Sequence, residues 1–179
     1  PETLVKMKIG FCGTMSVGKT TLVNALKELP EFKGYNFATE RSKYLNSLGI
    51  PLNHETTIEG QTIFLAERVT ELMQEKIITD RTIIDVMAFT NCATHTSYID
   101  ADAFETYAKR FLYHYNYMFY ISPEGLDIED NGVRETNPKY RNEIDETIQK
   151  LLSKHRPVFY TISGTTEERI KQILKVIKY

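Results

Sequence analysis

The sequence predicts an α/β fold in which a parallel sheet of five strands carries helices on both faces. Short apolar runs alternate along the chain with longer segments whose apolar residues recur every three or four positions. The first apolar run also leads directly into a glycine-containing loop that opens into such a segment. Strands separated by helices pair in parallel through right-handed crossovers, and the crossing helices then cover both faces of the sheet.

The order of these elements follows from the apolar patterns and from the residues that end them. Strands are expected at residues 8–12, 35–39, 76–80, 117–121 and 158–162. Helices are expected between them, with apolar stripes over residues 22–29, 44–48, 58–72, 84–88, 104–111, 144–152 and 170–177. Pro30 and Gly49 end the first two helices, and Thr165 with Glu168 has capping-box spacing at the start of the last one.

The composition indicates one ordinary globular domain over residues 1–179. Hydrophobic residues make up 41% and charged residues 26%, and the net charge of −2 marks no general affinity for nucleic acid or membranes. No apolar run approaches the ~20 residues that span a bilayer. Cys12 and Cys92 belong to no CxxC pair, which argues against a disulfide framework or a zinc site. We expect the cytoplasm of a cell or of a virus-infected host cell, no membrane partner, and a monomer or a homodimer.

The loop after the first strand fits the phosphate-binding pattern G-x-x-x-x-G-K-[ST] at every fixed position. Glycines let backbone N–H groups turn inward around a polyphosphate, and the helix N-terminus adds its positive end. Lys19 would reach the β- and γ-phosphates, and the Thr20 hydroxyl would ligate Mg²⁺. ATP and Mg²⁺ are therefore the expected cofactors. The residues expected to bind the nucleotide here are Gly13, Thr14, Met15, Ser16, Val17, Gly18, Lys19, Thr20 and Thr21.

Motifs that the sequence lacks narrow the class of P-loop protein. The N-K-x-D motif that reads guanine does not occur, which argues against a GTPase switch. An LSGGQ-like signature of transporter ATPases does not occur either, and 179 residues are few for a motor ATPase. A small kinase is therefore the leading class.

An acid followed by an arginine comes after each of the second and third strands. Glu40-Arg41 follows the second strand, and Asp80-Arg81 follows the third. Ligands of parallel α/β sheets bind at the carboxyl ends of the strands, where a carboxylate can hold Mg²⁺ or accept the proton of an acceptor hydroxyl. An adjacent arginine can clamp a phosphate or a carboxylate. The alternative interpretation is that the acids serve helix N-termini and the arginines are solvated, and either acid could be the base.

Taken together, the P-loop, Glu40-Arg41 and the run Asp80-Arg81-Thr82-x-x-Asp85 resemble the P-loop nucleoside and nucleotide kinases. The likeness is greatest to the AAA-like kinase family that includes ribosylnicotinamide kinases, and an origin in a virus is one expectation for this chain. Residues 130–134 resemble the D-G-x-R lid segment of that family, with one additional asparagine. Residues 163–169, which include Thr165, resemble the loop that borders adenine.

This resemblance implies a nucleoside-monophosphate-kinase-like fold with a short lid at about residues 124–141. It makes Lys19 and Thr20 the phosphate and Mg²⁺ residues and Asp80 the acid on the metal side. It makes Glu40 the base on the acceptor side. Arg81, with Arg41 beside Glu40, would bind the acceptor or its phosphate. The resemblance also implies that Arg134, together with Arg141, neutralises the transferring phosphoryl group and contacts the nucleotide.

The sequence thus predicts an ATP-dependent kinase that phosphorylates a hydroxyl or a phosphate of a nucleoside or nucleotide acceptor. Two alternatives stay open. One is a kinase that acts on DNA or RNA, at a 5′-end or a modified base, and an open groove lined by Lys43, Lys76, Lys109 and Arg110 would favour it. The other is a non-kinase ATPase with a regulatory role.

Overall fold

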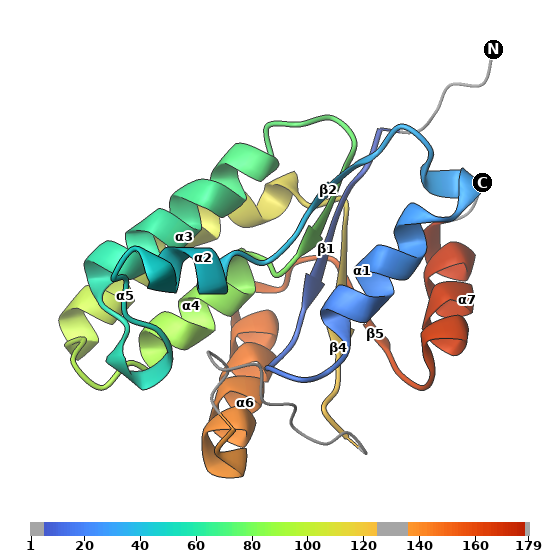
Figure 1. Ribbon diagram of the computed structural model, residues 1–179. Helices are drawn as coiled ribbons and strands as arrows, with labels where there is room; N and C mark the ends of the chain where they lie inside the picture. The colour runs from blue at the N-terminus through green and yellow to red at the C-terminus, as the bar shows by residue number, and fades with distance from the viewer. Residues whose placement is uncertain (1–5, 125–135, 178–179) are drawn as a thin grey trace.

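The computed structural model describes residues 6–124 and 136–177 and contains a parallel sheet of five strands in the order β2-β3-β1-β4-β5. Figure 1 shows the strands side by side between two groups of helices. The predicted α/β fold is confirmed. The strands are β1 (Lys8–Cys12), β2 (Asn36–Ala38), β3 (Ile77–Asp80), β4 (Tyr117–Ile121) and β5 (Phe159–Ile162).

Helices cover both faces of the sheet. On one face lie α1 (Lys19–Lys27) and α7 (Thr166–Ile177), drawn in blue and red in Figure 1. The opposite face carries the other long helices, α3 (Ile58–Glu71), α4 (Ile83–Asn91), α5 (Tyr98–Ala108) and α6 (Pro138–His155). The short helix α2 (Ser42–Ser47) follows β2, and 3₁₀ turns cover Pro30–Phe32, Asn53–Glu55 and Lys109–His114.

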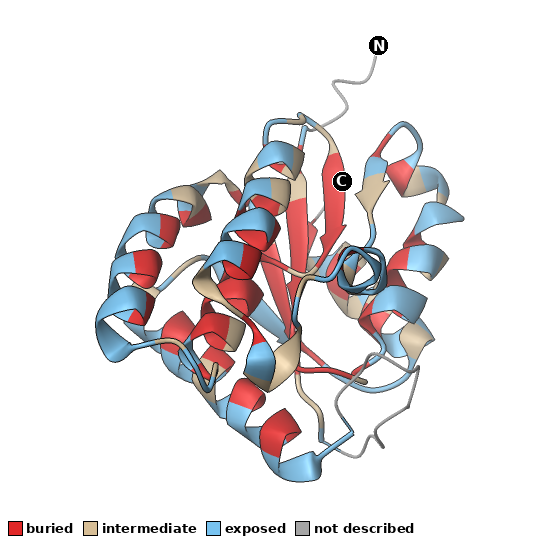
Figure 2. Cartoon of the chain, turned by 60° about the vertical axis from the view of Figure 1, so that its left-hand side comes forward, coloured by how far each residue is buried: buried red, intermediate tan, exposed pale blue. Residues whose placement is uncertain are grey.

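Alternation of side chains along the central strands divides the interior into two cores. Phe11 of β1 and Phe119 of β4 point toward α1 and α7, where their rings stack with centroids 5.5 Å apart. Cys12 and Met118, one position away, belong to the core under α3 to α6. Figure 2 shows the central strands and the inward faces of the helices buried, whereas the edge strands β2 and β5 are largely intermediate or exposed.

Two elements differ in extent from the sequence-based expectation. The second strand spans three residues instead of the predicted five, because Tyr35 N–H bonds the Phe32 carbonyl in a turn and Thr39 is exposed. The helix expected over residues 104–111 ends at Ala108 and continues as the 3₁₀ turn Lys109–His114. In the described part of the chain, no helix is long and apolar enough to cross a membrane.

The sheet order creates a crevice at the carboxyl ends of β1 and β3. These neighbouring strands are followed by helices on opposite faces, α1 after β1 and α4 after β3, so their connecting loops diverge. Gly10 in β1 allows close packing beneath the crevice, since a Cβ atom there would lie 2.6 Å from the Thr82 methyl and 2.8 Å from the Tyr115 ring. The Tyr115 hydroxyl in turn accepts a hydrogen bond from the Ile83 N–H at the start of α4.

Candidate active site

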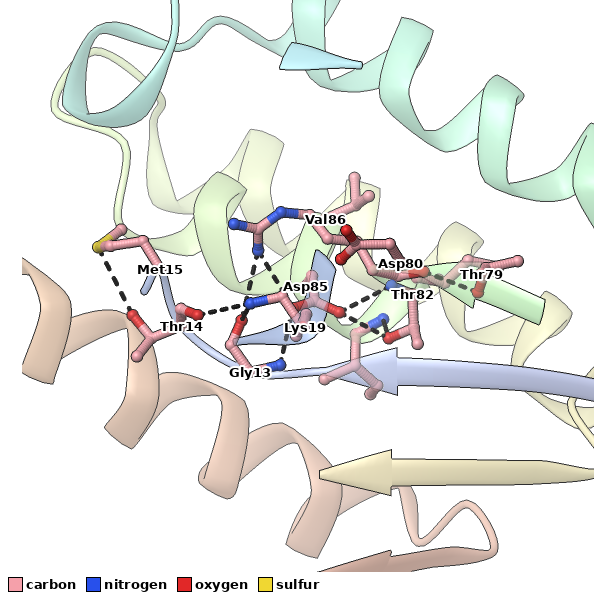
Figure 3. A network of polar contacts seen from close by, with 12 residues as sticks. Gly13, Thr14, Met15, Lys19, Thr79, Asp80, Thr82, Asp85 and Val86 are labelled. Atoms are coloured by element: carbon pink, nitrogen blue, oxygen red, sulfur yellow. Dashed lines mark hydrogen bonds and ion pairs between the residues drawn. The ribbon is translucent and has the colours of Figure 1, made fainter. Parts of the chain in front are cut away.

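The P-loop connects β1 to α1 and surrounds the Lys19 ammonium with its own carbonyl groups. Lys19 Nζ donates to the Gly13 carbonyl at 2.9 Å and to the Thr14 carbonyl at 2.6 Å (Figure 3). Gly18 has φ 81° and Ser16 has φ 60°, so the loop depends on left-handed backbone at both positions. Glycine adopts that conformation readily, whereas at Ser16 it is strained and the surrounding contacts must hold it.

The lysine charge is poorly compensated in this arrangement. Lys19 is 6% exposed. Burial, and after it the nearby Arg81 guanidinium, lower the pKa of its ammonium group to about 7, while Asp80 and Asp85 oppose the shift. A polyphosphate beside Lys19 would add negative charge and favour the protonated form. The lysine environment therefore suits an anionic ligand.

At the end of β3, Asp80 accepts a hydrogen bond from Thr20, the residue that follows Lys19. The distance from Thr20 Oγ1 to Asp80 Oδ2 is 2.5 Å, and Asp80 is 1% exposed. A carboxylate and a hydroxyl are hard oxygen ligands, and Mg²⁺ in nucleotide sites takes one or two such groups together with water and phosphate oxygens. The two side chains predicted to hold the metal thus lie together and fit it chemically.

Asp85 is a buried carboxylate that ties the P-loop to the start of α4. It completes a capping box with Thr82, accepting the Thr82 N–H at 2.7 Å and the Thr82 hydroxyl at 2.9 Å. The other oxygen accepts the Gly13 N–H at 3.1 Å (Figure 3). The T-x-x-D spacing of a capping box was present in the sequence, but it gave no indication that this carboxylate reaches the loop 72 residues earlier.

Arg81 lies directly after β3 and is held in an unusual backbone conformation. Its φ is 87°, a left-handed value that an arginine rarely adopts without constraint. The Arg81 Nη1 donates at 3.3 Å to both the Gly13 carbonyl and Asp85 Oδ1, and the guanidinium stacks 4.9 Å above the Phe89 ring. These contacts aim the guanidinium across the crevice beside the P-loop, where an arginine was predicted.

The side chains of Glu40 and Arg41, the other acid–arginine pair, point in different directions. The Glu40 carboxylate accepts the Ser42 N–H at the start of α2 and remains partly exposed in the crevice. Arg41 is half-exposed, pairs with Glu67 at 3.3 Å and stacks on Tyr44 at 4.6 Å. Its guanidinium therefore faces α3 and the surface, and Arg41 is absent from the described residues that line the two cavities below.

Two cavities open at the carboxyl ends of the strands and meet at Glu40 and Arg81. The first, called here the nucleotide cavity, follows the P-loop and reaches the turn before α7. The second, called here the acceptor cavity, lies between α3, α4 and the loop after α2. Lining the nucleotide cavity are Ser16, Val17, Gly18, Lys19, Thr20, Thr21, Glu40, Asp80, Arg81, Gly164, Thr165, Thr166 and Arg169. Lining the acceptor cavity are Met15, Glu40, Ser42, Leu52, Asn53, Gln61, Phe64, Arg68, Arg81, Asp85, Val86 and Phe89.

Most residues predicted to bind the nucleotide line the nucleotide cavity, but three do not. Gly13 and Thr14 lie behind the loop, where their carbonyls accept from Lys19, and the Met15 side chain lines the acceptor cavity. Thr165 lines the nucleotide cavity and caps α7, since its hydroxyl accepts the Glu168 N–H at 3.2 Å. Arg134 falls outside the described residues.

The acceptor cavity contains polar groups that sequence reasoning did not identify. Arg68 is 1% exposed and forms a two-point ion pair with Glu71, at 2.7 Å from Nε and 2.6 Å from Nη2. Gln61 accepts the Thr56 hydroxyl at 2.7 Å and donates to the Val86 carbonyl at 3.1 Å. Both side chains sit on the buried face of α3, where the sequence showed only an apolar stripe interrupted by polar residues.

Two further arginines donate hydrogen bonds to the backbone of the P-loop. Arg141 of α6 donates from Nε to the Met15 carbonyl and from Nη2 to the Ser16 carbonyl, both at 3.1 Å. Arg169 of α7 donates from Nη1 to the Val17 carbonyl at 2.7 Å. Arg141 was expected with the lid, but residues 138–141 belong to α6, and its guanidinium contacts the loop backbone.

Comparison with known proteins gives one family and a set of similar structures. The sequence model of a family described as an AAA domain matches residues 8–169. No curated protein matches the chain. The NadR protein in complex with NR superposes with a TM-score of 0.76 at 15% identity, over 96% of this chain and 51% of that chain. This chain therefore spans about half the length of NadR.

Two further structures match over nearly their whole length. Deoxyadenosine kinase from M. mycoides has a TM-score of 0.62 at 17% identity, covering 96% of this chain and 98% of that one. Thymidylate kinase from Ehrlichia chaffeensis has a TM-score of 0.64 at 14% identity, with the same coverage of 96% and 98%. At these identities the likeness establishes a shared fold, and the predicted kinase-like P-loop fold is confirmed.

Proposed function

The chain belongs to the AAA domain family, and from this premise we propose that it is a kinase that transfers the γ-phosphate of ATP to a hydroxyl group of a nucleoside-type acceptor. The observation that carries the proposal is that Glu40 and Arg81 line both cavities. A carboxylate and a cation at the junction suit a reaction that moves a phosphoryl group from one bound molecule to another. The two similar structures named as kinases support the same class of reaction.

On the donor side, the triphosphate of ATP would lie in the nucleotide cavity along the P-loop. Lys19 and the backbone N–H groups of the loop would bind the β- and γ-phosphates, and the N-terminus of α1 would add its positive end. Mg²⁺, held by the Thr20 hydroxyl and the Asp80 carboxylate, would neutralise part of the phosphate charge when bound. Thr165 and Thr166 would border the nucleoside part of ATP at the far end of the cavity.

On the acceptor side, the charge balance favours an uncharged acceptor over a nucleotide. Both arginines in the lining already have carboxylate partners, Arg68 with Glu71 and Arg81 with Asp85. The Glu40 carboxylate adds a negative charge at the junction. An acceptor phosphate would bring about two more negative charges toward groups that are already neutralised, which is unfavourable in a partly buried site.

The proposed reaction is an in-line displacement at the γ-phosphorus. The acceptor hydroxyl gives its proton to the Glu40 carboxylate while its oxygen forms a bond to phosphorus. The bond from phosphorus to the β–γ bridging oxygen breaks, and that electron pair leaves with ADP, so the products are ADP and a phosphate monoester. Arg81, fixed through its Nη1 by Asp85 and the Gly13 carbonyl, would donate hydrogen bonds to the transferring oxygens from its remaining N–H groups.

The positions of the basic residues weaken the case for a nucleic-acid acceptor. Lys109 and Arg110 line a separate hollow with Pro157 and Val158, which precede β5. That hollow therefore lies toward the amino ends of the strands, and Lys76, just before β3, lies at the same end. Lys43 is exposed on α2. Among the described residues, none of these four lines the nucleotide or the acceptor cavity.

An acceptor screen with γ-labelled ATP tests the proposal and its rivals together. The acceptors are ribonucleosides and deoxynucleosides, their 5′-monophosphates, and single- and double-stranded DNA, each with Mg²⁺. Label should appear on a nucleoside at least about tenfold faster than on its monophosphate, since a single unfavourable charge interaction is worth that much. Transfer to DNA would favour the nucleic-acid kinase, faster transfer to the monophosphate would contradict the hydroxyl acceptor, and release of label only as inorganic phosphate would favour a regulatory ATPase.

A further inference from the structure

Each backbone carbonyl of the P-loop from residue 13 to residue 17 accepts a hydrogen bond from a lysine or arginine side chain. Lys19 donates to the Gly13 and Thr14 carbonyls, and Arg81 also donates to the Gly13 carbonyl. The remaining three are held by Arg141 and Arg169. The next carbonyl, that of Gly18, begins the regular hydrogen bonding of α1 by accepting the Leu22 N–H at 3.0 Å.

The two arginines come from the same position of different helices. Each is the fourth residue of its helix, Arg141 in α6 and Arg169 in α7. They are 7% and 5% exposed, so both side chains are buried against the loop. Arg169 also packs against Gly18, where a Cβ atom would lie 2.9 Å from its Nη1. This contact, together with the positive φ, explains the glycine at that position.

A hydrogen bond that holds a P-loop carbonyl away from the nucleotide cavity also fixes the direction of the N–H group in the same peptide unit. The peptide unit is planar and trans, so its C=O and N–H point in opposite directions. The Met15, Ser16 and Val17 carbonyls share peptide units with the N–H groups of the next residue in each case. Those next residues, Ser16, Val17 and Gly18, line the nucleotide cavity. By holding these carbonyls, the arginines thus orient the N–H donors that face the nucleotide cavity.

From this geometry we infer that Arg141 and Arg169 are positioning residues that hold the P-loop in its phosphate-binding conformation. Both act through hydrogen bonds to the loop backbone. Arg141 lies outside the described lining of the nucleotide cavity, whereas Arg169 also lines that cavity, so Arg141 tests the positioning role more directly. The strained left-handed backbone at Ser16 makes such support necessary, because an unsupported loop would relax toward an ordinary conformation. The inference rests on the phosphate-binding part of the proposed function and is independent of the acceptor.

Binding of inorganic tripolyphosphate to the full chain, measured by titration calorimetry, tests this role without ATP, metal or acceptor chemistry. Arg141→Met and Arg169→Met should each raise the dissociation constant on the order of tenfold or more, the scale of losing a hydrogen bond to a charged group. Arg110→Met is the matched control, since Arg110 is exposed and lies away from the site. Thermal unfolding shows whether each variant remains folded at the measuring temperature.

Lysine variants keep the positive charge but change the hydrogen-bond geometry, so they distinguish a positioning role from an effect of charge alone. They also replace a methionine variant that does not fold. Arg169 uses one N–H group, so Arg169→Lys should recover most of the affinity. Arg141 uses two N–H groups on successive carbonyls, a geometry that an ammonium cannot reproduce, so Arg141→Lys should recover little. Wild-type affinity in folded Arg141→Met and Arg169→Met, or in Arg141→Lys, would overturn the inference alone. A wild-type chain that does not bind tripolyphosphate would contradict the proposed function as well.

Discussion

The Thr20 hydroxyl donates a hydrogen bond to the Asp80 carboxylate across the crevice, with 2.5 Å between the two oxygens. Thr20 follows the P-loop lysine at the start of α1, and Asp80 ends β3, the strand next to β1. The contact joins a residue recognised by the P-loop motif to a residue predicted from its place at the end of a strand and from the family resemblance. It fixes the side of the nucleotide cavity on which Mg²⁺ would be held.

Asp80→Asn should lower turnover by at least ~10²-fold, the scale of losing a positioned electrostatic group. The amide keeps the volume and can still accept from Thr20, but it removes the negative charge that would hold Mg²⁺. Steady-state kinetics over a range of Mg²⁺ concentrations measure the effect, with Thr20→Ser as a control that retains the hydroxyl. A loss below about threefold at saturating Mg²⁺ would assign Asp80 a structural role.

Nucleotide binding should take up a proton above neutral pH through Lys19. Burial lowers the pKa of the Lys19 ammonium to about 7, so at pH 8 most of the ligand-free protein holds a neutral amine. The bound polyphosphate raises that pKa, so uptake should approach ~0.9 proton per MgATP at pH 8 and fall to ~0.1 at pH 6.

Calorimetry in two buffers of different ionisation enthalpy measures this proton uptake. Lys19→Arg is the matched control, because a guanidinium stays protonated throughout and should show no uptake of its own. The difference between the two proteins also removes the protons that belong to the nucleotide. Equal uptake by wild type and Lys19→Arg at pH 8 would show that Lys19 is already charged in the free protein.

Glu40→Gln should lower turnover by roughly 10²–10⁴-fold while leaving the KM for ATP nearly unchanged. The amide oxygen can still accept the Ser42 N–H, so the start of α2 is preserved while the base is lost. Glu59→Gln, the same change at an exposed position of α3, serves as the control. An affinity for ATP that collapses together with activity would place Glu40 in metal binding or in the fold instead.

Asp85→Asn should destabilise the fold by about 2–4 kcal/mol, because the buried carboxylate accepts from the Thr82 backbone, the Thr82 hydroxyl, Gly13 and Arg81. An amide cannot serve all four donors and leaves the Arg81 charge without its partner. Asp100→Asn makes the same change at the same helix position of α5, where Asp100 is exposed, and should cost under about 1 kcal/mol. Urea unfolding compares the two, and equal losses would contradict a bridging role for Asp85.

Local patterns were enough to predict the P-loop and the edge of the sheet at which the site lies. The loop depends on glycine backbone conformations and on Lys19 and Thr20, which are adjacent in sequence. The Thr20–Asp80 contact could be anticipated because the carboxyl ends of neighbouring parallel strands meet at one edge of a sheet.

Contacts that depend on tertiary packing were beyond the same reasoning. The Arg141–Met15 and Arg169–Val17 contacts join residues 126 and 152 positions apart, and no spacing rule links them. Arg41 shows the same limit, since adjacency to Glu40 could not indicate that its guanidinium turns toward Glu67. The α4 partners of Gln61, the Val86 carbonyl and the Thr90 hydroxyl, likewise become apparent only when α3 packs against α4.

The most direct test of the central claim follows both products in one ³¹P NMR time course with ATP, Mg²⁺ and a nucleoside acceptor. If Glu40 and Arg81 join a donor cavity to an acceptor cavity, ADP and a new phosphate monoester should form in equal amounts. Inorganic phosphate should stay near the background of a Lys19→Ala control, which lacks the phosphate-binding charge. ADP that accumulates with inorganic phosphate alone, across the whole range of nucleosides, would contradict phosphate transfer to an acceptor.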